Sequence, residues 1–266
     1  MSHYRCAVIT DGTKTVEELM AAYQENNLET VPQEYLEFYD ETDEYKSDYE
    51  GGSLVFYRDP DTLALYWQYD DRFKSDEVAG QRYVIPGGYA KVEIPCNVVY
   101  PTFESYMGEF CDKEPNEDGR YGYWENPNAR WDWYTEYESP CWVDEMLGHT
   151  PTRLSGVRFD PDRMEAEARA FIRDNPADGD GRHSLERYLN MRGMTDEQYV
   201  ESSRHLSFWA CVTPDGEWHE VAKMGWFGMS EDVGGDAFYR WCVEFEERFI
   251  EPYAPDCVLH VLDCHI

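Results

Sequence analysis

Apolar residues follow the most regular patterns near the two ends of the chain. At the N-terminal end, residues 4–10 form a short and mostly apolar run, which predicts a strand. A capping box follows, because Thr15 stands three residues before Glu18, and Val16 and Leu19 then occupy one face at helical spacing. The pattern at this end of the chain therefore predicts a strand followed by a helix.

The C-terminal part of the chain has a second set of regular patterns. Residues 206–213 predict a strand, Pro214-Asp215-Gly216 a tight turn and residues 217–221 the partner strand, so this part of the chain predicts a hairpin. Aromatic residues recur at helical spacing over residues 238–249, and a last strand is predicted at 257–265.

The predicted elements occur in the order β-α at one end and β-β-α-β at the other. This is the order of the ferredoxin-like split βαββαβ motif, so we expect an α+β fold with a core formed by residues 1–28 and 205–266. In that core the first and last strands are antiparallel neighbours. Residues 29–204 would then form a large inserted α+β subdomain, acidic and rich in aromatic residues.

The inserted part is predicted to contain four strands and two helices. The strands lie at residues 54–58, 64–69, 81–86 and 91–100. Pro95 interrupts the last of them, which favours a bulge or an edge strand. The helices begin after Asp160-Pro161 and after Thr195, which opens another capping box.

The net charge narrows the range of functions. The 266 residues include 55 Asp or Glu and 23 Lys or Arg, which gives a formal charge of −32 and a sequence pI near 4.4. A nucleic-acid backbone and an anionic lipid surface both require clustered basic residues, so we expect neither direct nucleic-acid binding nor membrane binding. The net charge does not decide whether the protein forms homo-oligomers.

Cysteine usage and the absence of a targeting pattern indicate a cytoplasmic protein in a bacterial host cell. No apolar run approaches the ~18 residues that span a bilayer, and the first residues have no signal-peptide pattern. The eight cysteines contain no CxxC pair, and most lie in apolar runs, which is typical of buried free thiols. We find no phosphate-binding or hydrolase motif, so we expect no cofactor and a binding protein rather than an enzyme.

Histidines near the two ends form one candidate site. If the first and last strands are antiparallel neighbours, His3 lies close to His265, with Asp263 and Cys264 beside them. Such a group is able to bind a metal or to act as an acid/base pair. The alternative is that these are sheet-edge residues hydrated by water, and on this signal alone we predict neither a metal site nor a catalytic residue.

The densest aromatic stretch is a second candidate site. Arg130, Trp131, Trp133 and Tyr134 are able to form a cation–π and aromatic platform after the turn-forming sequence Asn126-Pro127-Asn128. The alternative is that these rings are part of the hydrophobic core.

The same stretch resembles a known family. Residues 126–134, NPNARWDWY, resemble the signature of an uncharacterised family from bacteriophages, prophages and other mobile elements, which usually has Asn-Pro-Asn-Ala/Ser-Lys-Trp-Asp-Trp-Tyr. Residues 1–4, 223–229 and 261–266 also resemble segments of that family, in the same order. The family implies no activity. This chain departs from it at residues 135–139, where an acidic sequence replaces the usual Ile-Gly-Gly-Arg-Trp.

The charge and the resemblance together suggest a function. A net charge of −32 equals that of roughly 16 base pairs, or about 54 Å of duplex, and a chain of this length is roughly 45–50 Å across. We therefore expect a counter-defence protein that inhibits a host nucleic-acid-binding defence protein, such as a CRISPR effector or a restriction enzyme, as an acidic DNA mimic. Its contact region would be residues 29–50. The candidate partner-binding residues are Glu34, Glu37, Tyr39, Asp40, Glu41, Asp43, Glu44 and Tyr45.

Two alternatives remain. The acidity alone is also typical of a protein that needs only high solubility. In the other alternative the protein binds or hydrolyses a nucleotide, for example as a sponge for an immune signal, through the His3/Asp263/His265 group or the Arg130/Trp131 stretch. A pocket for a phosphate ligand must then contain basic residues, because the ligand has to overcome the negative field. The candidates are Arg120, Arg130 and Arg153.

Overall fold

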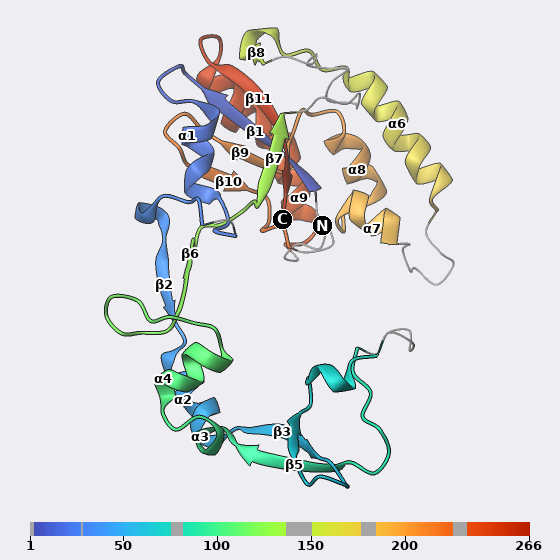
Figure 1. The fold of residues 1–266 in the computed structure, drawn as a ribbon. Coiled ribbons are helices and arrows are strands. Elements are labelled where there is room, and N and C mark those ends of the chain that lie inside the picture. The colour runs from blue at the N-terminus through green and yellow to red at the C-terminus, as the bar shows by residue number, and fades with distance from the viewer. Residues whose placement is uncertain (1–2, 28, 76–81, 137–150, 177–184, 226–232) are drawn as a thin grey trace. The chain divides into compact units, whose positions relative to one another are not determined.

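In the computed structural model the chain consists of two compact units (Figure 1). Unit 1 comprises Met1–Glu37 and Glu125–Ile266, and unit 2 comprises Phe38–Trp124. The structure describes residues 3–27, 29–75, 82–136, 151–176, 185–225 and 233–266. Within these ranges, none of the helices combines the length and the apolar character needed to cross a bilayer.

Unit 1 is built on a mixed sheet that contains both ends of the described chain. Its strands are β1 (His3–Thr10), β7 (Trp133–Glu136), β8 (Thr152–Arg153), β9 (Ala210–Val212), β10 (Trp218–Glu220) and β11 (Val258–His265). They are ordered β10-β9-β1-β11-β7, and β8 pairs with β11 beside β7. β1 and β11 pair antiparallel over their full lengths, as the sequence predicts.

The strand order differs from the predicted split arrangement. In a split βαβ unit a third strand separates the two parallel strands, whereas β1 pairs directly with β9, in parallel. The predicted hairpin is present, but β10 lies at the sheet edge. Residue types agree with this order, because β9 is wholly apolar and fully buried, whereas β10 contains His219 and Glu220 and is only half-buried. The α+β class is therefore confirmed, and the ferredoxin-like order is not found among the described strands.

Unit 2 is shorter than the predicted insertion of residues 29–204. β7 and β8 come from that insertion, yet both pair with β11 and complete the main sheet. Pairing with β7 covers a strand edge of β11 that would otherwise be open. The segment from Glu125 onward therefore belongs to unit 1.

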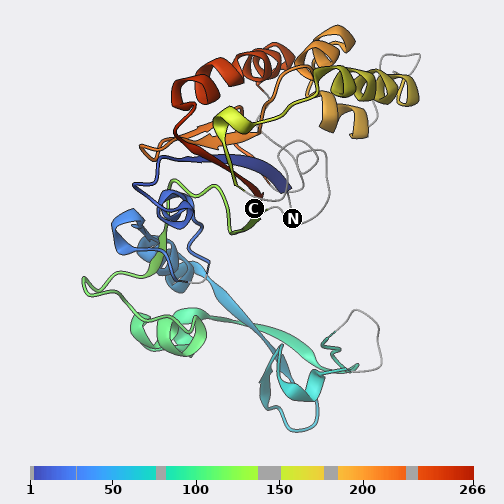
Figure 2. The ribbon, with the colours of Figure 1, turned by 90° about the horizontal axis from the view of Figure 1, so that it is seen from above.

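Helices cover both faces of the main sheet (Figure 2). They are α1 (Val16–Met20), α6 (Pro161–Asp174), α7 (Leu185–Met191), α8 (Asp196–Ser202) and α9 (Gly235–Phe245). Short turns continue two of them: η1 (Ala21–Tyr23) follows α1, and η7 (Glu246–Ile250) and η8 (Glu251–Tyr253) follow α9. Two others are η2 (Gln33–Tyr35) and η5 (Leu154–Gly156). The predicted caps are present, because Thr15, Asp160 and Thr195 each accept a hydrogen bond from a backbone N–H of the following turn.

Alternation along β1 assigns its residues to two hydrophobic cores. Ala7 and Ile9 pack with Trp241 and Phe245 of α9 on one face. On the other face Cys6 and Val8 belong to a second core, which contains Leu19 and Met20 of α1. The sheet is thus the middle of three layers. Within it, the antiparallel register of β1 and β11 places the first residue of β1 beside the last residue of β11.

Unit 2 has a small core of its own. Its strands are β2 (Glu37–Asp40), β3 (Ser53–Arg58), β4 (Leu65–Trp67), β5 (Ala90–Pro95) and β6 (Gly122–Glu125). Its helices are α2 (Thr42–Gly51), η3 (Asp71–Phe73), α3 (Cys96–Val99), α4 (Phe103–Ser105) and η4 (Tyr106–Phe110). β4-β3-β5 form one antiparallel sheet, and β2 pairs with β6. Tyr45 and Tyr49 of α2 pack on Cys96, Tyr106 and Met107.

Two predicted strands of unit 2 differ from the observed ones. The strand expected at 81–86 is absent from the described residues 82–86, of which Tyr83 makes only an isolated bridge to Lys74. The strand expected at 91–100 ends at Pro95, where α3 begins. A proline donates no backbone hydrogen bond, so it is a natural end for β5.

Replacing Gly122 by alanine is expected to disrupt the pairing of β2 with β6. A Cβ atom at this position would overlap the carbonyl oxygen of Tyr39 and would lie 3.0 Å from Cζ of Phe38. Such overpacking typically costs about 1–3 kcal/mol. Faster amide exchange in β2 and β6 of Gly122→Ala would confirm the prediction. Gly108→Ala is the control, because nothing lies within 4 Å of its Cβ position, and equal exchange in both variants would contradict it.

Candidate functional site

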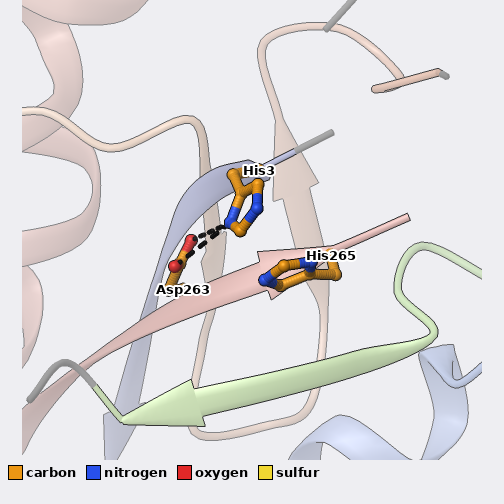
Figure 3. Close-up of side chains that lie close together, drawn as sticks. All are labelled: His3, Asp263 and His265. Atoms are coloured by element: carbon orange, nitrogen blue, oxygen red, sulfur yellow. Dashed lines mark hydrogen bonds and ion pairs between the residues drawn. The ribbon is translucent and has the colours of Figure 1, made fainter. Parts of the chain in front are cut away.

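His3, Asp263 and His265 form a cluster at the end of the main sheet (Figure 3). His3 begins β1, and the register places it opposite His265 of β11. His3 Nδ1 lies 3.4 Å from Oδ1 and 3.3 Å from Oδ2 of Asp263. One potential ligand atom of each residue lies within 4.8 Å of the other two. The proximity of His3 to His265 is therefore confirmed.

Cys264 is not part of this cluster. Successive residues of a strand point to opposite faces, so Asp263 and His265 share one face and Cys264 points to the other. There it is fully buried in the core that contains Tyr4 and Cys6. The seven described cysteines, this one included, are free thiols, and Cys141 lies outside the described residues.

His265 is the most enclosed member of the cluster. Only 3% of its surface is exposed, and its ring stacks on Trp133, with 3.3 Å between the ring centroids. The ring of His3 approaches it edge-on at 3.5 Å. Nδ1 of His265 is buried and has no hydrogen-bond partner among the described residues. Burial, together with the nearby His3, lowers the pKa of His265, so the neutral imidazole is favoured.

Two charged residues near the cluster were missed by the sequence analysis. Arg5 lies opposite Asp263 in the register of β1 and β11. Asp132 donates its backbone N–H to the carbonyl oxygen of His265, and its carboxylate is one of the charges that act on the imidazole of that residue. Alternation along β1 was sufficient to find Arg5, because residues 3 and 5 share a face.

His3 and Asp263 also line a cavity of about 670 Å³ in unit 1. Trp209, Trp241 and Phe238 provide much of its apolar wall. Arg5 and Arg192 line it as well, and Asp263 is the one carboxylate among the described lining residues. The guanidinium of Arg192 lies 4.9 Å from the ring centre of Trp209, and burial lowers its pKa. The cavity is thus locally basic in a strongly acidic protein.

The predicted aromatic platform is not assembled as one surface. Trp131 is a core residue, 6% exposed, and its indole Nε1 donates to the carbonyl oxygen of Met20. Nε of Arg130 donates to the carboxylate of Glu220 at 2.8 Å. Tyr134 is half-buried and contacts the ring of Trp131 edge-on. Trp133 alone joins the histidine cluster, and it is 42% exposed.

The Asn-Pro-Asn sequence has a structural role in unit 1. The side-chain amide of Asn126 donates to the carbonyl oxygens of Ala22 and Gln24, at 2.9 and 3.0 Å, and its own oxygen accepts the backbone N–H of Asn128. Asn126 is only 5% exposed. These bonds fix the start of the aromatic stretch against the segment that follows α1, and β7 begins from there.

The other two arginines proposed for a phosphate pocket lie elsewhere. Arg120 belongs to unit 2 and forms ion pairs with Asp40 and Asp118. Arg153 belongs to β8, and neither residue lines the cavity of unit 1.

The predicted acidic contact residues divide between exposed and paired positions. Asp43 and Glu44 are exposed in the first turn of α2, while Glu34 and Glu37 are exposed in η2 and at the start of β2. The hydroxyl and backbone N–H of Thr42 lower the pKa of Asp40, which also lies 3.6 Å from Arg120.

Two further predicted contact residues are tied to the body of unit 2. Glu41 lies 3.5 Å from Lys113 and accepts a hydrogen bond from the hydroxyl of Tyr45. Tyr45 packs against the core of unit 2. The two residues therefore support the fold of unit 2 more directly than they form an open surface.

Exposed aromatic side chains are concentrated in unit 2. Of the seven tyrosine and tryptophan side chains that are exposed among the described residues, five lie in unit 2, although it contains only a third of the chain. Tyr39 of β2 is 51% exposed and its ring lies 5.2 Å from that of Tyr123 on β6. Trp124 is 42% exposed. We call Tyr39, Tyr123 and Trp124 the ribbon aromatics. Of these, the sequence analysis identified only Tyr39.

Residues from three of the four family-like segments meet at the histidine cluster. They are His3, Trp133 and the pair Asp263 and His265. Of the fourth segment, Met224 lines the cavity, whereas residues 226–229, like Met1 and Ser2, lie outside the described residues. No protein-family model, no curated protein and no solved structure matches this chain, so its site is interpreted from its own geometry.

Proposed function

We propose that the protein is a mobile-element counter-defence protein that binds a basic, nucleic-acid-binding defence protein of the host through unit 2. The observation that supports this most is the concentration of exposed aromatic side chains beside carboxylates in unit 2. Binding of this kind would occupy the groove of the partner and keep nucleic acid out of it.

The ribbon aromatics have the properties of binding anchors. Tyrosine and tryptophan dominate the hot spots of protein interfaces, because they bury a large area at a small cost in conformational entropy. A two-stranded ribbon also gains stability from cross-strand aromatic pairs, so part of their role is structural. Exposed fractions of 42–51% leave much of each ring available to a partner.

The charge contributes mainly through the whole protein. Unit 2 contains 19 acidic and eight basic residues, a net charge of −11, while the rest of the chain carries −21. The density of charge per residue is therefore similar in both units, and the field of the entire molecule attracts a basic partner.

The acidic helix α2 does not by itself reproduce a duplex. Its ten residues include Asp43, Glu44, Asp48 and Glu50 but also Lys46, and a helix of that length extends about 15 Å. A duplex of 15 Å has roughly nine phosphate charges. We therefore assign the acids of unit 2 to steering and orientation, and the ribbon aromatics to affinity.

Capture from bacterial lysates tests the proposal. Untagged protein coupled to beads is incubated with lysates of cells that express CRISPR and restriction systems, at low salt and at ~0.5 M salt, where the Debye length is about 4–5 Å. The expected result is retention of a nucleic-acid-binding protein at low salt, weaker retention at high salt, and release by excess duplex DNA. The proposal would be contradicted if the retained proteins stayed on the beads in the presence of excess duplex DNA.

A second function is favoured by the cavity of unit 1. Arg5, Trp241 and the stacked pair of Arg192 and Trp209 line the same cavity, and this set is suited to an anionic ligand with an aromatic base, such as a nucleotide. Calorimetry with nucleotides would show binding that depends little on salt and is weakened by Arg192→Ala. Binding that is equal in Arg192→Ala and the wild-type protein would exclude the cavity as its site.

A further inference from the structure

We infer that His3, Asp263 and His265 bind one divalent transition-metal ion, of which Zn²⁺ is the representative. The site is independent of the proposed partner binding, because all three ligands lie in unit 1. Figure 3 shows the three side chains on adjacent strands, with the carboxylate of Asp263 directed toward His3.

The residue types suit this class of metal. Imidazole nitrogens bind Zn²⁺, Ni²⁺, Cu²⁺ and Fe²⁺, and two histidines with one carboxylate form a recurrent three-ligand set. Mg²⁺ and Ca²⁺ prefer oxygen ligands, of which this cluster has only those of Asp263.

The distances are close to those of a metal-ligand set. Ligand atoms about 2.0–2.1 Å from a tetrahedral Zn²⁺ lie roughly 3.3 Å from one another. Nδ1 of His3 is 3.3 and 3.4 Å from the two oxygens of Asp263, which is long for a hydrogen bond but matches that separation. All three ligand atoms lie within 4.8 Å of each other, so rotations of the His3 and Asp263 side chains are sufficient to bring them to metal-binding separations.

The buried ring of His265 supplies an independent observation. The side chain is 97% buried, as its exposed fraction of 3% implies, and Nδ1 has no hydrogen-bond partner among the described residues. A buried polar atom without a partner is destabilising, because it has lost its bonds to water. Its ring is held between Trp133 and His3, and one of its nitrogens lies within 4.8 Å of a potential ligand atom of each of the other two residues. A metal ion bound by this imidazole provides a reason for that arrangement.

Charges around the cluster favour a cation. The protein has a net charge of −32, and the carboxylates of Asp132 and Asp263 both act on His265. Arg5, which lies opposite Asp263 in the register, carries a positive charge that acts against cation binding. Three protein ligands leave at least one coordination position for water or a small ligand, and two of the three, His3 and Asp263, line the cavity of unit 1.

Metal titration of the full-length, tag-free protein tests the inference. Zn²⁺ affinity is measured by competition with a chromogenic chelator, in excess Mg²⁺ to block binding to surface carboxylates, and Co²⁺ replaces Zn²⁺ for absorption spectra. The wild-type protein is expected to bind one Zn²⁺. Its Co²⁺ form is expected to give an absorption spectrum typical of a site with a low coordination number. Asp263→Asn and His3→Gln are expected to weaken binding by at least about tenfold, since each removes a ligand.

The control uses a second histidine on the same strand. His260 of β11 also lies 3.3 Å from a carboxylate, that of Glu136, but it belongs to no three-ligand cluster among the described residues. His260→Gln should bind Zn²⁺ as the wild-type protein does. The inference is overturned if the wild-type protein takes up no Zn²⁺, or if all three variants bind it equally while circular dichroism shows that they are folded.

Discussion

Replacing Trp131 by alanine is expected to destabilise unit 1 by about 3–5 kcal/mol, the usual cost of truncating a buried tryptophan. The side chain is 6% exposed and lies in the core shared by β1, β11 and α1. The substitution leaves a large cavity and also removes the donor to the carbonyl oxygen of Met20. Amide hydrogen exchange of β1 and β11 would measure the loss, because buried strands report the free energy of global opening.

Trp133→Ala is the matched control for this prediction. Trp133 stands two residues further along and is 42% exposed, so its replacement should cost no more than about 1 kcal/mol. It should instead alter the surroundings of His265, on which its ring stacks. If both variants show the same exchange in β1 and β11, then Trp131 is not the core residue that the structure describes.

Replacing Tyr39 and Tyr123 together by alanine is expected to weaken binding to the captured partner at least about 30-fold, because a single hot-spot residue already contributes roughly 2 kcal/mol and hot-spot contributions are not additive. The loss should occur mainly in the dissociation rate. Reversal of charge at Asp43 and Glu44 should instead lower the association rate, and this effect should vanish at ~0.5 M salt. Surface plasmon resonance separates the two rates.

Tyr188→Ala is the control for the tyrosine replacements. Tyr188 belongs to α7 of unit 1 and is 43% exposed, as Tyr123 is in unit 2. Its replacement should leave both rates unchanged. Because Tyr39 and Tyr123 also support the pairing of β2 with β6, Tyr39→Phe serves as a variant that keeps the ring. Equal losses in Tyr188→Ala and the double variant would contradict a binding role of unit 2.

Features that depend on local sequence were predicted well. Thr15 and Thr195 form capping boxes as expected, since a capping box involves only four consecutive positions. The pairing of the two terminal strands was predicted from element order, and it placed His3 opposite His265. Two of the three cluster residues followed from that pairing. Asp263 was predicted only as a sequence neighbour of His265, together with Cys264, which the alternation of side chains along a strand excludes.

Features that depend on long-range pairing were not predictable. β9 is apolar along its whole length, whereas β10 contains His219 and Glu220, so composition favours β9 as the inner strand. The ferredoxin-like order was predicted from the order of elements alone, which does not fix which strand of a hairpin pairs with β1. β7 is only four residues long, so its pairing with β11 depends on tertiary contacts such as those of Asn126. The placement of β7 beside β11 also decides that Trp131 is buried in the core while Trp133 is exposed. Exposure of Tyr123 and Trp124 was missed because aromatic residues are usually buried.

Displacement of labelled duplex DNA from the captured partner tests the central proposal most directly. The partner is first saturated with a fluorescent duplex, and the full-length protein is then added while anisotropy is recorded. We predict a complete loss of bound duplex with the wild-type protein and at least about 30-fold weaker displacement with the Tyr39/Tyr123 double alanine variant. Duplex that stays bound while the protein also binds the partner would contradict the account.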